Sequence, residues 1–207
     1  KTFSCLSRRN THMKEEGMLI PSVTFKYRVR TDGKPITYVD KNNGNANPFE
    51  FKDITTGDIF NDKRVVVFSL PGAYTPTCST YQVPGFEENY DAIKEMGVDE
   101  IYVLSVNDTF VMRQWMIHQG CENIKFIPDG NAEFTEAMGM LNCMTAVGFG
   151  NRSRRYAMVV NDGVIEKLFV EPMGTEEDPD PYGETSPESV MKYLQSTEKF
   201  EFIKGLK

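Results

Sequence analysis

The sequence predicts an α/β protein whose central mixed β-sheet carries helices on both faces. Two runs rich in β-branched and aromatic residues, 65–70 and 101–106, have the composition of buried strands. Helical patterns separate these runs, as expected for parallel strands joined by crossovers. Near the C-terminus, 156–160 and 164–170 flank Asn161-Asp-Gly163, which predicts an antiparallel hairpin. Parallel and antiparallel neighbours together make the predicted sheet mixed.

The length of the chain favours one domain. With 207 residues, of which 40% are hydrophobic, the chain can bury one sizeable core. Residues 1–17 combine basic and polar side chains with little apolar pattern. We therefore expect a disordered N-terminal tail at 1–17, followed by a single domain at 18–207.

A net charge of −7 narrows the range of partners. Nucleic acids and anionic membranes bind basic surfaces, so neither is expected as a partner. No apolar run has the length of a transmembrane helix, and no apolar segment follows the basic N-terminus as in a secretory signal. We expect a soluble, cytoplasmic protein; an organelle is the alternative if the tail is a targeting remnant.

Four short segments precede the first buried strand. Residues 22–29 alternate polar and apolar side chains, which predicts a half-exposed strand with 36–39 as a candidate hairpin partner. The Asn-rich stretch 41–47 is predicted to be a loop. Residues 53–60 suit a short helical turn that leads into the buried strand.

Helices are predicted after each buried strand. Proline lacks a backbone donor, so the helix after Cys78 is expected to stop before Pro84 and to resume from Phe86 to Met96. The helix that follows 101–106 is expected to share one face among Phe110, Val111, Gln114 and Trp115. Further along, the sequence predicts a strand at 124–127, a helix at 132–138, an exposed acidic loop at 171–187 and a last helix capped by Ser186.

The sequence offers little for a metal or cofactor site. Its cysteines are widely spaced and its histidines few: Cys5, Cys78, Cys121, Cys143, His12 and His118. Structural metal sites need closely paired ligands, so we expect no metal and no bound cofactor. Cys121 and Cys143 are expected to be inert thiols in a reducing compartment.

Cys78 carries the strongest signal for chemistry. Pro71-Gly72 closes the 65–70 strand and predicts a tight turn into a helix that starts near Cys78. There, unpaired backbone N–H groups and the helix dipole favour a thiolate. A thiol–disulfide exchanger would have a second cysteine where this chain has Thr75, whose hydroxyl can hydrogen bond a thiolate and an incoming oxygen. The competing interpretation is a buried structural cysteine.

Several segments of the chain occur in the order that is typical of one protein family. Pro71-x-x-x-Thr75-x-x-Cys78 is followed by Val83-Pro-Gly-Phe86 and then, in order, by 104–108, 126–130, 138–140, 148–150 and 155–163. Over roughly residues 18–196 the sequence resembles the peroxiredoxins, in particular the peroxiredoxin-5-like branch, which includes bacterial hybrids with a fused glutaredoxin domain. The resemblance implies a thioredoxin-like fold and a thiol-dependent peroxidase that forms a sulfenic acid on Cys78.

The resemblance also implies roles for individual residues. Arg155 matches the arginine of the family, which would stabilise the thiolate and bind the peroxide oxygens; without the resemblance, it would be interpreted as a solvated charge beside Arg152 and Arg154. Thr75 and the backbone N–H groups of Thr77 and Cys78 would be further donors to the substrate. Pro71 would shield the sulfur from over-oxidation.

Partners follow from the same resemblance. Some members of the branch carry a resolving cysteine in the segment that corresponds to 171–187, and this chain has none there. Either Cys121 or Cys143 resolves the sulfenic acid, or an external thiol such as glutathione with glutaredoxin, or thioredoxin, reduces it. We favour the external route. A homodimer is expected, with Phe110 and Trp115 as candidates for its interface.

Two other functions are compatible with parts of the sequence. The first is a redox sensor, in which oxidation of Cys78 is relayed to a partner and turnover is incidental. The second function is phosphate or nucleic-acid binding by residues 148–155, which contain glycines and three arginines. The glycines match no complete phosphate-loop pattern and the chain is acidic, so the second signal is weak.

Overall fold

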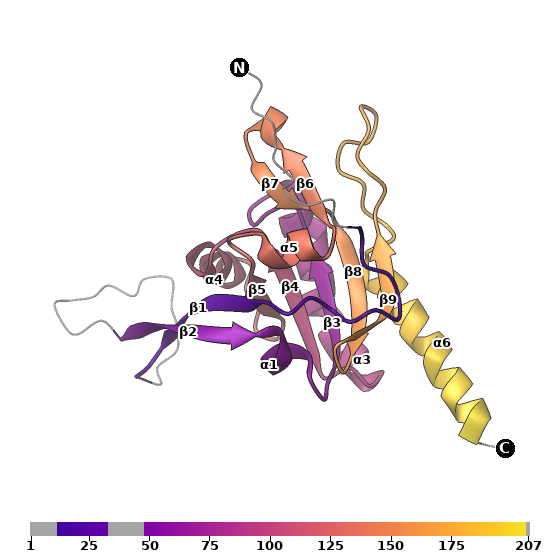
Figure 1. Ribbon diagram of the computed structural model, residues 1–207. Helices are drawn as coiled ribbons and strands as arrows, with labels where there is room; N and C mark the ends of the chain where they lie inside the picture. The colour runs from indigo at the N-terminus through magenta and orange to yellow at the C-terminus, as the bar shows by residue number, and fades with distance from the viewer. Residues whose placement is uncertain (1–11, 33–47, 206–207) are drawn as a thin grey trace.

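A five-stranded mixed sheet forms the centre of the molecule. The computed structural model describes residues 12–32 and 48–205. The strand order is β5-β4-β3-β8-β9 (Figure 1), in which β3 pairs in parallel with β4 and antiparallel with β8. The strands are β3 (Arg64–Ser69), β4 (Glu100–Ser105), β5 (Lys125–Pro128), β8 (Tyr156–Asn161) and β9 (Val164–Val170). The predicted mixed sheet is confirmed.

Side chains of the central strands alternate between two buried cores. Val66 and Phe68 of β3 pack with α2 (Val83–Glu88), α3 (Tyr90–Glu95), α4 (Thr109–His118) and α6 (Pro187–Gly205). Val65 and Val67 face the other side, where they pack with β1 (Thr24–Arg30), α1 (Thr56–Phe60) and α5 (Glu133–Ala137). Because both faces of β3 are covered, its sequence is continuously apolar instead of alternating.

The predicted C-terminal hairpin is present. β8 and β9 pair antiparallel around Asp162 and Gly163, whose φ angles are +47° and +76°. Two successive residues with positive φ match the twist of the flanking strands, and Asp-Gly accepts that conformation at low cost. A second, smaller hairpin joins β6 (Leu141–Met144) to β7 (Gly150–Ser153) through a short 3₁₀ turn at Thr145–Val147.

The partner of the first strand differs from the prediction. β1 pairs antiparallel with β2 (Phe49–Thr55), and residues 36–47, which include the predicted partner and loop, lie outside the described residues. The predicted helical turn at 53–60 begins late, because 53–55 complete β2. Thr55 caps α1: its Oγ1 accepts from the N–H of Asp58 at 3.1 Å, and Asp58 Oδ2 accepts from the N–H of Thr55 at 2.8 Å.

The predicted break before Pro84 is wrong. A π-helical turn, Cys78–Gln82, runs directly into α2, which contains Pro84 at its first turn. In this wider turn the N–H of Val83 donates to the carbonyl of Cys78, five residues back, so the ring of Pro84 meets less crowding than in a regular α-helix. The helix breaks instead at Asn89, between α2 and α3.

The buried face of α4 also differs from the prediction. Its buried residues are Thr109, Met112, Trp115 and Met116. Of the predicted face only Trp115 is fully buried, whereas Phe110 is 46% exposed. The helix has apolar residues around much of its circumference, so the periodicity did not specify which side faces the sheet. Asp108 caps it through hydrogen bonds from the backbone N–H groups of Phe110 and Val111.

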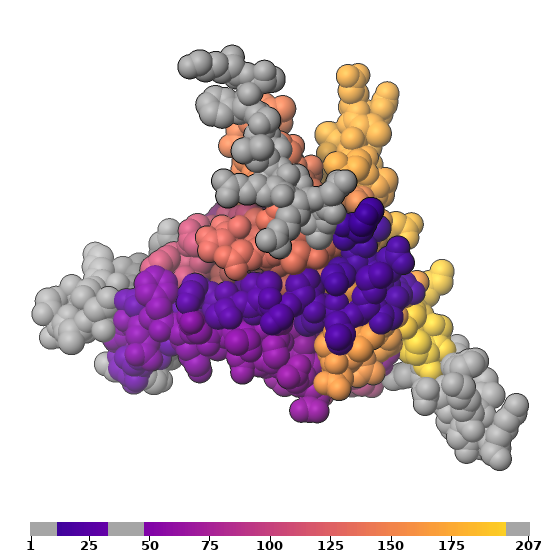
Figure 2. Space-filling model, viewed as in Figure 1, coloured from indigo at the N-terminus to yellow at the C-terminus, as the bar shows by residue number. Residues whose placement is uncertain are grey.

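Part of the predicted N-terminal tail is ordered. Gly17 and Ile20 donate backbone hydrogen bonds to Ile165 and Gly163, and Glu16 pairs with Lys167 at 2.7 Å. Figure 2 shows this segment running across the molecule beside β9. Residues 12–17 are therefore fixed by the edge of the sheet, an interaction that their own composition does not reveal. Residues 1–11 lie outside the described residues.

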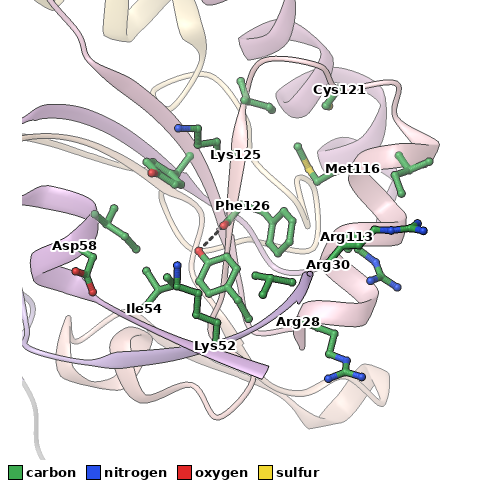
Figure 3. A pocket seen from close by; sticks show the side chains of 16 residues that line it. Arg28, Arg30, Lys52, Ile54, Asp58, Arg113, Met116, Cys121, Lys125 and Phe126 are labelled. Atoms are coloured by element: carbon green, nitrogen blue, oxygen red, sulfur yellow. Dashed lines mark hydrogen bonds between the residues drawn. The ribbon is translucent and has the colours of Figure 1, made fainter. Parts of the chain in front are cut away.

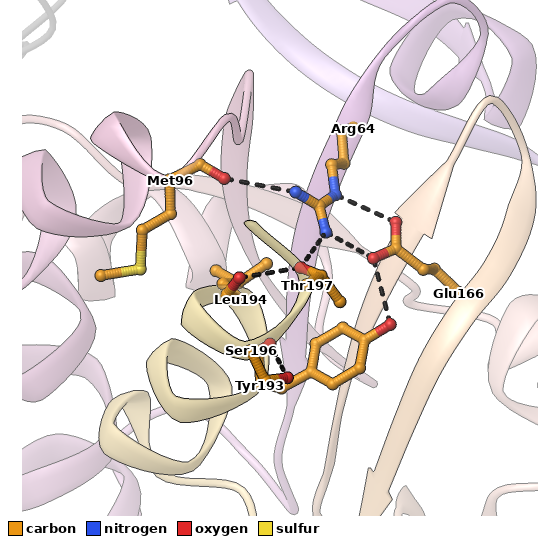
Figure 4. Close-up of polar contacts among 7 residues, drawn as sticks. All are labelled: Arg64, Met96, Glu166, Tyr193, Leu194, Ser196 and Thr197. Atoms are coloured by element: carbon orange, nitrogen blue, oxygen red, sulfur yellow. Dashed lines mark hydrogen bonds and ion pairs between the residues drawn. The ribbon is translucent and has the colours of Figure 1, made fainter. Parts of the chain in front are cut away.

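Arg64 joins the last helix to the sheet. Its guanidinium donates to Glu166 of β9, to the carbonyl of Met96 at 3.2 Å and to Thr197 of α6 at 3.3 Å (Figure 4). Tyr193 of α6 donates to the same Glu166 at 3.1 Å. The cluster fixes α6 against the β3 and β9 side of the sheet. Within the described residues, no helix has the length and apolarity to cross a membrane.

Candidate active site

Cys78 lies in the first turn of the helix that follows β3. Pro76 and Thr77 are already helical, and the N–H of Ser79 donates to the carbonyl of Thr75 at 3.0 Å. Backbone N–H groups in a first helical turn have no partner within the helix and can stabilise an anion. The Cys78 side chain is 0% exposed. The sequence-based placement at a helix start is confirmed, and the sulfur is shielded from bulk water.

Arg155 reaches the sulfur of Cys78. Its Nη1 donates to Cys78 Sγ at 3.4 Å, and the arginine is only 4% exposed. The neighbouring arginines turn elsewhere: Arg152 Nε donates to the carbonyl of Phe149, and Arg154 Nη2 to the carbonyl of Glu171. The interpretation of Arg155 as a solvated charge is therefore wrong. Residue spacing alone could not separate these three arginines, because only the start of β8 turns Arg155 inward.

Two residues that sequence reasoning missed hold the guanidinium. Gln82 Oε1 accepts from Arg155 Nη1 at 2.6 Å, and the carboxylate of Asp180 pairs with Nη2. Burial by itself would lower the pKa of Arg155, but its interactions with Cys78 and with the Asp180 carboxylate outweigh burial and raise that pKa. The cation is thus fixed from both sides. Gln82 lies one helical turn after Cys78, and this spacing could have indicated that it belongs to the site. Nothing in the sequence indicated Asp180.

Two N–H donors of the residues around the sulfur have no hydrogen-bond partner in the part of the chain that the structure describes. Arg155 Nε and Gln82 Nε2 are buried and have no hydrogen-bond partner among the described residues. Buried polar groups without partners are rare and cost free energy, which the protein recovers when a ligand supplies acceptors. The site therefore offers N–H donors to a small molecule with oxygen acceptors.

Pro71 and Thr75 flank the turn that leads from β3 into the helix of Cys78. The hydroxyl of Thr75 donates to the carbonyl of Gly72 at 2.8 Å, so its proton is engaged and its oxygen remains able to accept. Pro71 lines a cavity of about 50 Å³ together with Arg155 and Asp180. A cavity of this size has room for a molecule as small as water or hydrogen peroxide. Thr77 is helical, and its side chain is half-buried.

The 171–187 segment is less exposed than predicted. Glu171 is 4% exposed and accepts hydrogen bonds from the N–H groups of Gly183 and Thr185 and from the Thr185 hydroxyl, at 2.7–2.9 Å. This carboxylate closes the segment into a loop, so Asp180 is presented to Arg155. Acidic composition predicted a solvated loop, whereas the tertiary contacts draw its two ends into the protein.

The other cysteines lie in different environments. Cys121 is a half-buried thiol whose pKa is raised to about 12, by burial and by the charge of Glu87. Cys143 is exposed on β6 and is disulfide-bonded, so the expectation of an inert thiol is wrong for it. An exposed sulfur is accessible to another cysteine, which composition cannot reveal. No cluster of three or more metal-binding side chains occurs in the part of the chain that the structure describes.

Comparison with known proteins identifies the family of this site. A protein-family model described as Redoxin matches residues 15–184. A peroxiredoxin from Rhizobium etli is 49% identical over 178 residues, which cover 86% of this chain and 94% of that protein. The chain belongs to the peroxiredoxin family. As a peroxiredoxin it is a thiol-dependent peroxidase, which confirms the predicted class of enzyme.

Further comparisons specify the branch and the fold. The hybrid peroxiredoxin hyPrx5 of Haemophilus influenzae is 46% identical over 179 residues, which cover 86% of this chain and 66% of that protein. The crystal structure of the Plasmodium falciparum antioxidant protein, a 1-Cys peroxiredoxin, is 35% identical with a TM-score of 0.74, covering 87% of this chain and 99% of that one. The peroxiredoxin-5-like branch and the thioredoxin-like fold predicted from the sequence are both confirmed.

Proposed function

We propose that Cys78 is the peroxidatic cysteine of this peroxiredoxin and that Arg155 is its catalytic partner. The observation that carries the proposal is the 3.4 Å hydrogen bond from Arg155 Nη1 to Cys78 Sγ inside a buried site. A cation in direct contact with sulfur favours the thiolate, which is the nucleophilic form. Cys121 lacks such a partner among its described contacts, since its pKa is raised by burial and by an acid.

The proposed reaction is a displacement at a peroxide oxygen. The Cys78 thiolate attacks one oxygen, the S–O bond forms as the O–O bond breaks, and the sulfur becomes a sulfenic acid. The other oxygen leaves as hydroxide or alkoxide and takes a proton from water. Arg155 and the N–H groups of the first helical turn stabilise the negative charge on this departing oxygen. The unpaired Nε of Arg155 and Nε2 of Gln82 support this role.

Three further residues complete the proposed site. Thr75 accepts a hydrogen bond from the O–H of the peroxide, because its own proton is held by the carbonyl of Gly72. The backbone N–H of Thr77 contributes to substrate binding. Pro71 limits access to the sulfur, which slows a second oxidation; it also lines the small cavity beside Arg155, although Cys78 itself does not line that cavity.

We further propose that an external thiol recycles the enzyme. The 171–187 loop contains no cysteine, Cys121 is held in its weakly nucleophilic thiol form, and the sulfur of Cys143 is already in a disulfide. One thiol condenses with the sulfenic acid and releases water, and a second reduces the mixed disulfide. Glutathione with glutaredoxin, or thioredoxin, would supply these thiols. The name of the similar 1-Cys peroxiredoxin is consistent with this route.

The proposed assembly is a homodimer that acts in the cytoplasm. Trp115, one of the two residues expected at the interface, is fully buried within the chain and cannot contribute, so that part of the prediction is wrong. Phe110 remains available, and the exposed aromatic rings of Tyr74 and Tyr81 lie on the turn and the helix that flank Cys78. Exposed aromatic residues are enriched at protein interfaces.

The experiment that tests the proposal combines identification of the oxidised sulfur with a turnover assay. One equivalent of hydrogen peroxide should convert Cys78 to a sulfenic acid that dimedone traps, as seen by peptide mass spectrometry. Turnover is then measured with glutathione and glutaredoxin, with thioredoxin and its reductase, and with neither. Cys121→Ser and Cys143→Ser serve as matched controls and should turn over normally. Loss of turnover in either control would contradict the external-thiol route.

A redox sensor is the second candidate function. The buried position of Cys78 and the loop that presents Asp180 to Arg155 would allow oxidation to be coupled to a change of surface. The same assay separates the two functions. A sensor would be oxidised once and would not sustain many cycles with excess peroxide and a thiol donor.

A further inference from the structure

A large pocket lies on the opposite side of α4 from the Cys78 site. It has a volume of about 780 Å³, within the range of about 300–1,000 Å³ that is typical of small-molecule sites. Its walls come from β1 and β2, from the end of α1, from the end of α4 with the segment that follows it, and from the edge strand β5 (Figure 3). None of the residues proposed for the peroxidase reaction lines it.

The interior of the pocket is apolar. Met116, Ile117 and Cys121 line it from the α4 side, and Ile54 and Phe126 from the strands. Tyr27 stacks on Phe126 with 5.6 Å between the ring centroids and donates its hydroxyl to the carbonyl of Phe126 at 2.6 Å. The tyrosine therefore presents its ring face to the pocket while its polar atom is already satisfied. Such a surface gains free energy when it is covered by hydrocarbon.

The rim of the pocket is strongly basic. Its charged lining residues are five cations and one anion, namely Arg28, Arg30, Lys52, Arg113, Lys125 and Asp58. Figure 3 shows the three arginines together at one side, and the two lysines with Asp58 towards the other. The whole chain carries a net charge of −7, so this concentration of positive charge runs against the composition of the protein.

Arg28 is the most available of these cations. Arg30 pairs with Asp32, and Lys125 with Glu100 at 2.6 Å. Hydrogen bonds from Thr55 and the charge of Lys52 lower the pKa of Asp58, so Lys52 and Asp58 offset each other. The guanidinium of Arg28 lies 5.0 Å from the ring centroid of Phe51 and forms no ion pair with any residue that the structure describes. The local field therefore favours an anion on the side of the rim that carries the arginines.

We propose that this pocket binds a single-chain anionic amphiphile, a fatty carboxylate, with its hydrocarbon chain against the apolar interior and its carboxylate at the rim near Arg28, on the side of the three arginines. The apolar interior would reject a small inorganic anion, and the basic rim would repel a cationic amphiphile and give a neutral one no charge to pair with. Charge and shape together thus specify the chemical class. The inference is independent of the function proposed for Cys78, because no lining residue is shared.

The test is a titration of the whole protein with three probes of equal chain length. Dodecanoate, dodecan-1-ol and dodecyltrimethylammonium are each added at concentrations below micelle formation, with binding followed by isothermal titration calorimetry. Dodecanoate should bind one molecule per chain, at least tenfold more tightly than the other two. Its affinity should fall as salt is raised, because the rim cations are exposed and screened. Equal affinity for dodecanoate and dodecan-1-ol would overturn the proposal.

Variants locate the binding site. The change Arg28→Gln should weaken dodecanoate binding about tenfold and leave dodecan-1-ol binding unchanged. The matched control is Lys26→Gln, which removes one positive charge from the same strand at a side chain that is 63% exposed and does not line the pocket. It should leave dodecanoate affinity unchanged. Equal losses in the control and in Arg28→Gln would show a non-specific charge effect and contradict the proposal.

A wall variant tests the interior. Ile117 is half-buried, so Ile117→Glu can be tolerated by the fold while it places a carboxylate against the bound chain. Dodecanoate binding should be lost, and peroxide reduction should continue at the parental rate, which shows that the protein is folded. If dodecanoate still binds with parental affinity to this active variant, the ligand occupies another place and the proposal fails.

Discussion

The thiols of Cys78 and Cys121 show how two free cysteines of one protein become chemically different. Both are removed from water to a large extent, and both pack against the same hydrophobic core. Cys78 lies in a first helical turn and accepts a hydrogen bond from Arg155, whereas Cys121 follows the end of α4 with Glu87 as its electrostatic neighbour. Burial and a neighbouring acid therefore raise the pKa of Cys121, whereas Cys78 is the cysteine that a buried cation contacts and that we propose as the nucleophile.

Removing the two sulfurs one at a time should give the largest difference. Cys78→Ser is expected to lower the rate of peroxide reduction by at least about 10³-fold, because the hydroxyl is a far weaker nucleophile than a thiolate. Cys121→Ser should react at the parental rate. Stopped-flow measurement of hydrogen peroxide consumption checks both. Similar rates for the two variants would remove the distinction between the thiols.

Removing the cation should give the next largest effect. Arg155→Met is expected to slow the reaction by about 10²–10³-fold with the fold intact, since it deletes the main charged donor to sulfur and substrate. Arg152→Met is the matched control, because that arginine lies three residues earlier and donates to the carbonyl of Phe149. The prediction fails if both arginine variants lose activity to the same degree.

The inert thiol should reveal itself through its pH dependence. Because burial and Glu87 raise the pKa of Cys121 to about 12, its thiolate fraction should grow about tenfold for each pH unit between pH 7 and pH 10. Alkylation of the Cys78→Ser variant by iodoacetamide, quantified at Cys121 by mass spectrometry, should accelerate accordingly without reaching a plateau. A plateau near pH 8 would mean that its environment resembles water.

The hydroxyl beside the nucleophile should matter less than the charge. Thr75→Val keeps the shape of the side chain but removes the oxygen that is placed to accept from the peroxide. One neutral hydrogen bond is worth about 1 kcal/mol, so the reaction should slow about fivefold. Single-turnover kinetics should show the loss, with an unchanged melting temperature as the control for folding. A parental rate would exclude Thr75 from the reaction.

The smallest effect is expected at the outer partner of Arg155. Asp180 is 40% exposed, so solvent screens its ion pair, and Asp180→Asn should slow peroxide reduction only about threefold. Asp178→Asn, on the same loop, is the control because Asp178 forms its hydrogen bonds with Thr175 through its backbone. A faster variant would instead mean that Asp180 competes with the substrate for Arg155.

The sequence by itself determined the class of fold and singled out Cys78 as the candidate nucleophile, because both depend on local pattern. Continuous apolar runs, an Asp-Gly turn and a Pro-Gly turn ahead of Cys78 act within a few residues of the chain. The family resemblance pointed to Arg155 among three neighbouring arginines, which residue spacing could not separate. Only the tertiary structure decided that Gln82 and Asp180 hold this arginine and that residues 12–17 are ordered. These outcomes depend on contacts between segments far apart in the chain, such as Asp180 with Arg155 and Gly17 with Ile165, and composition does not encode such distances.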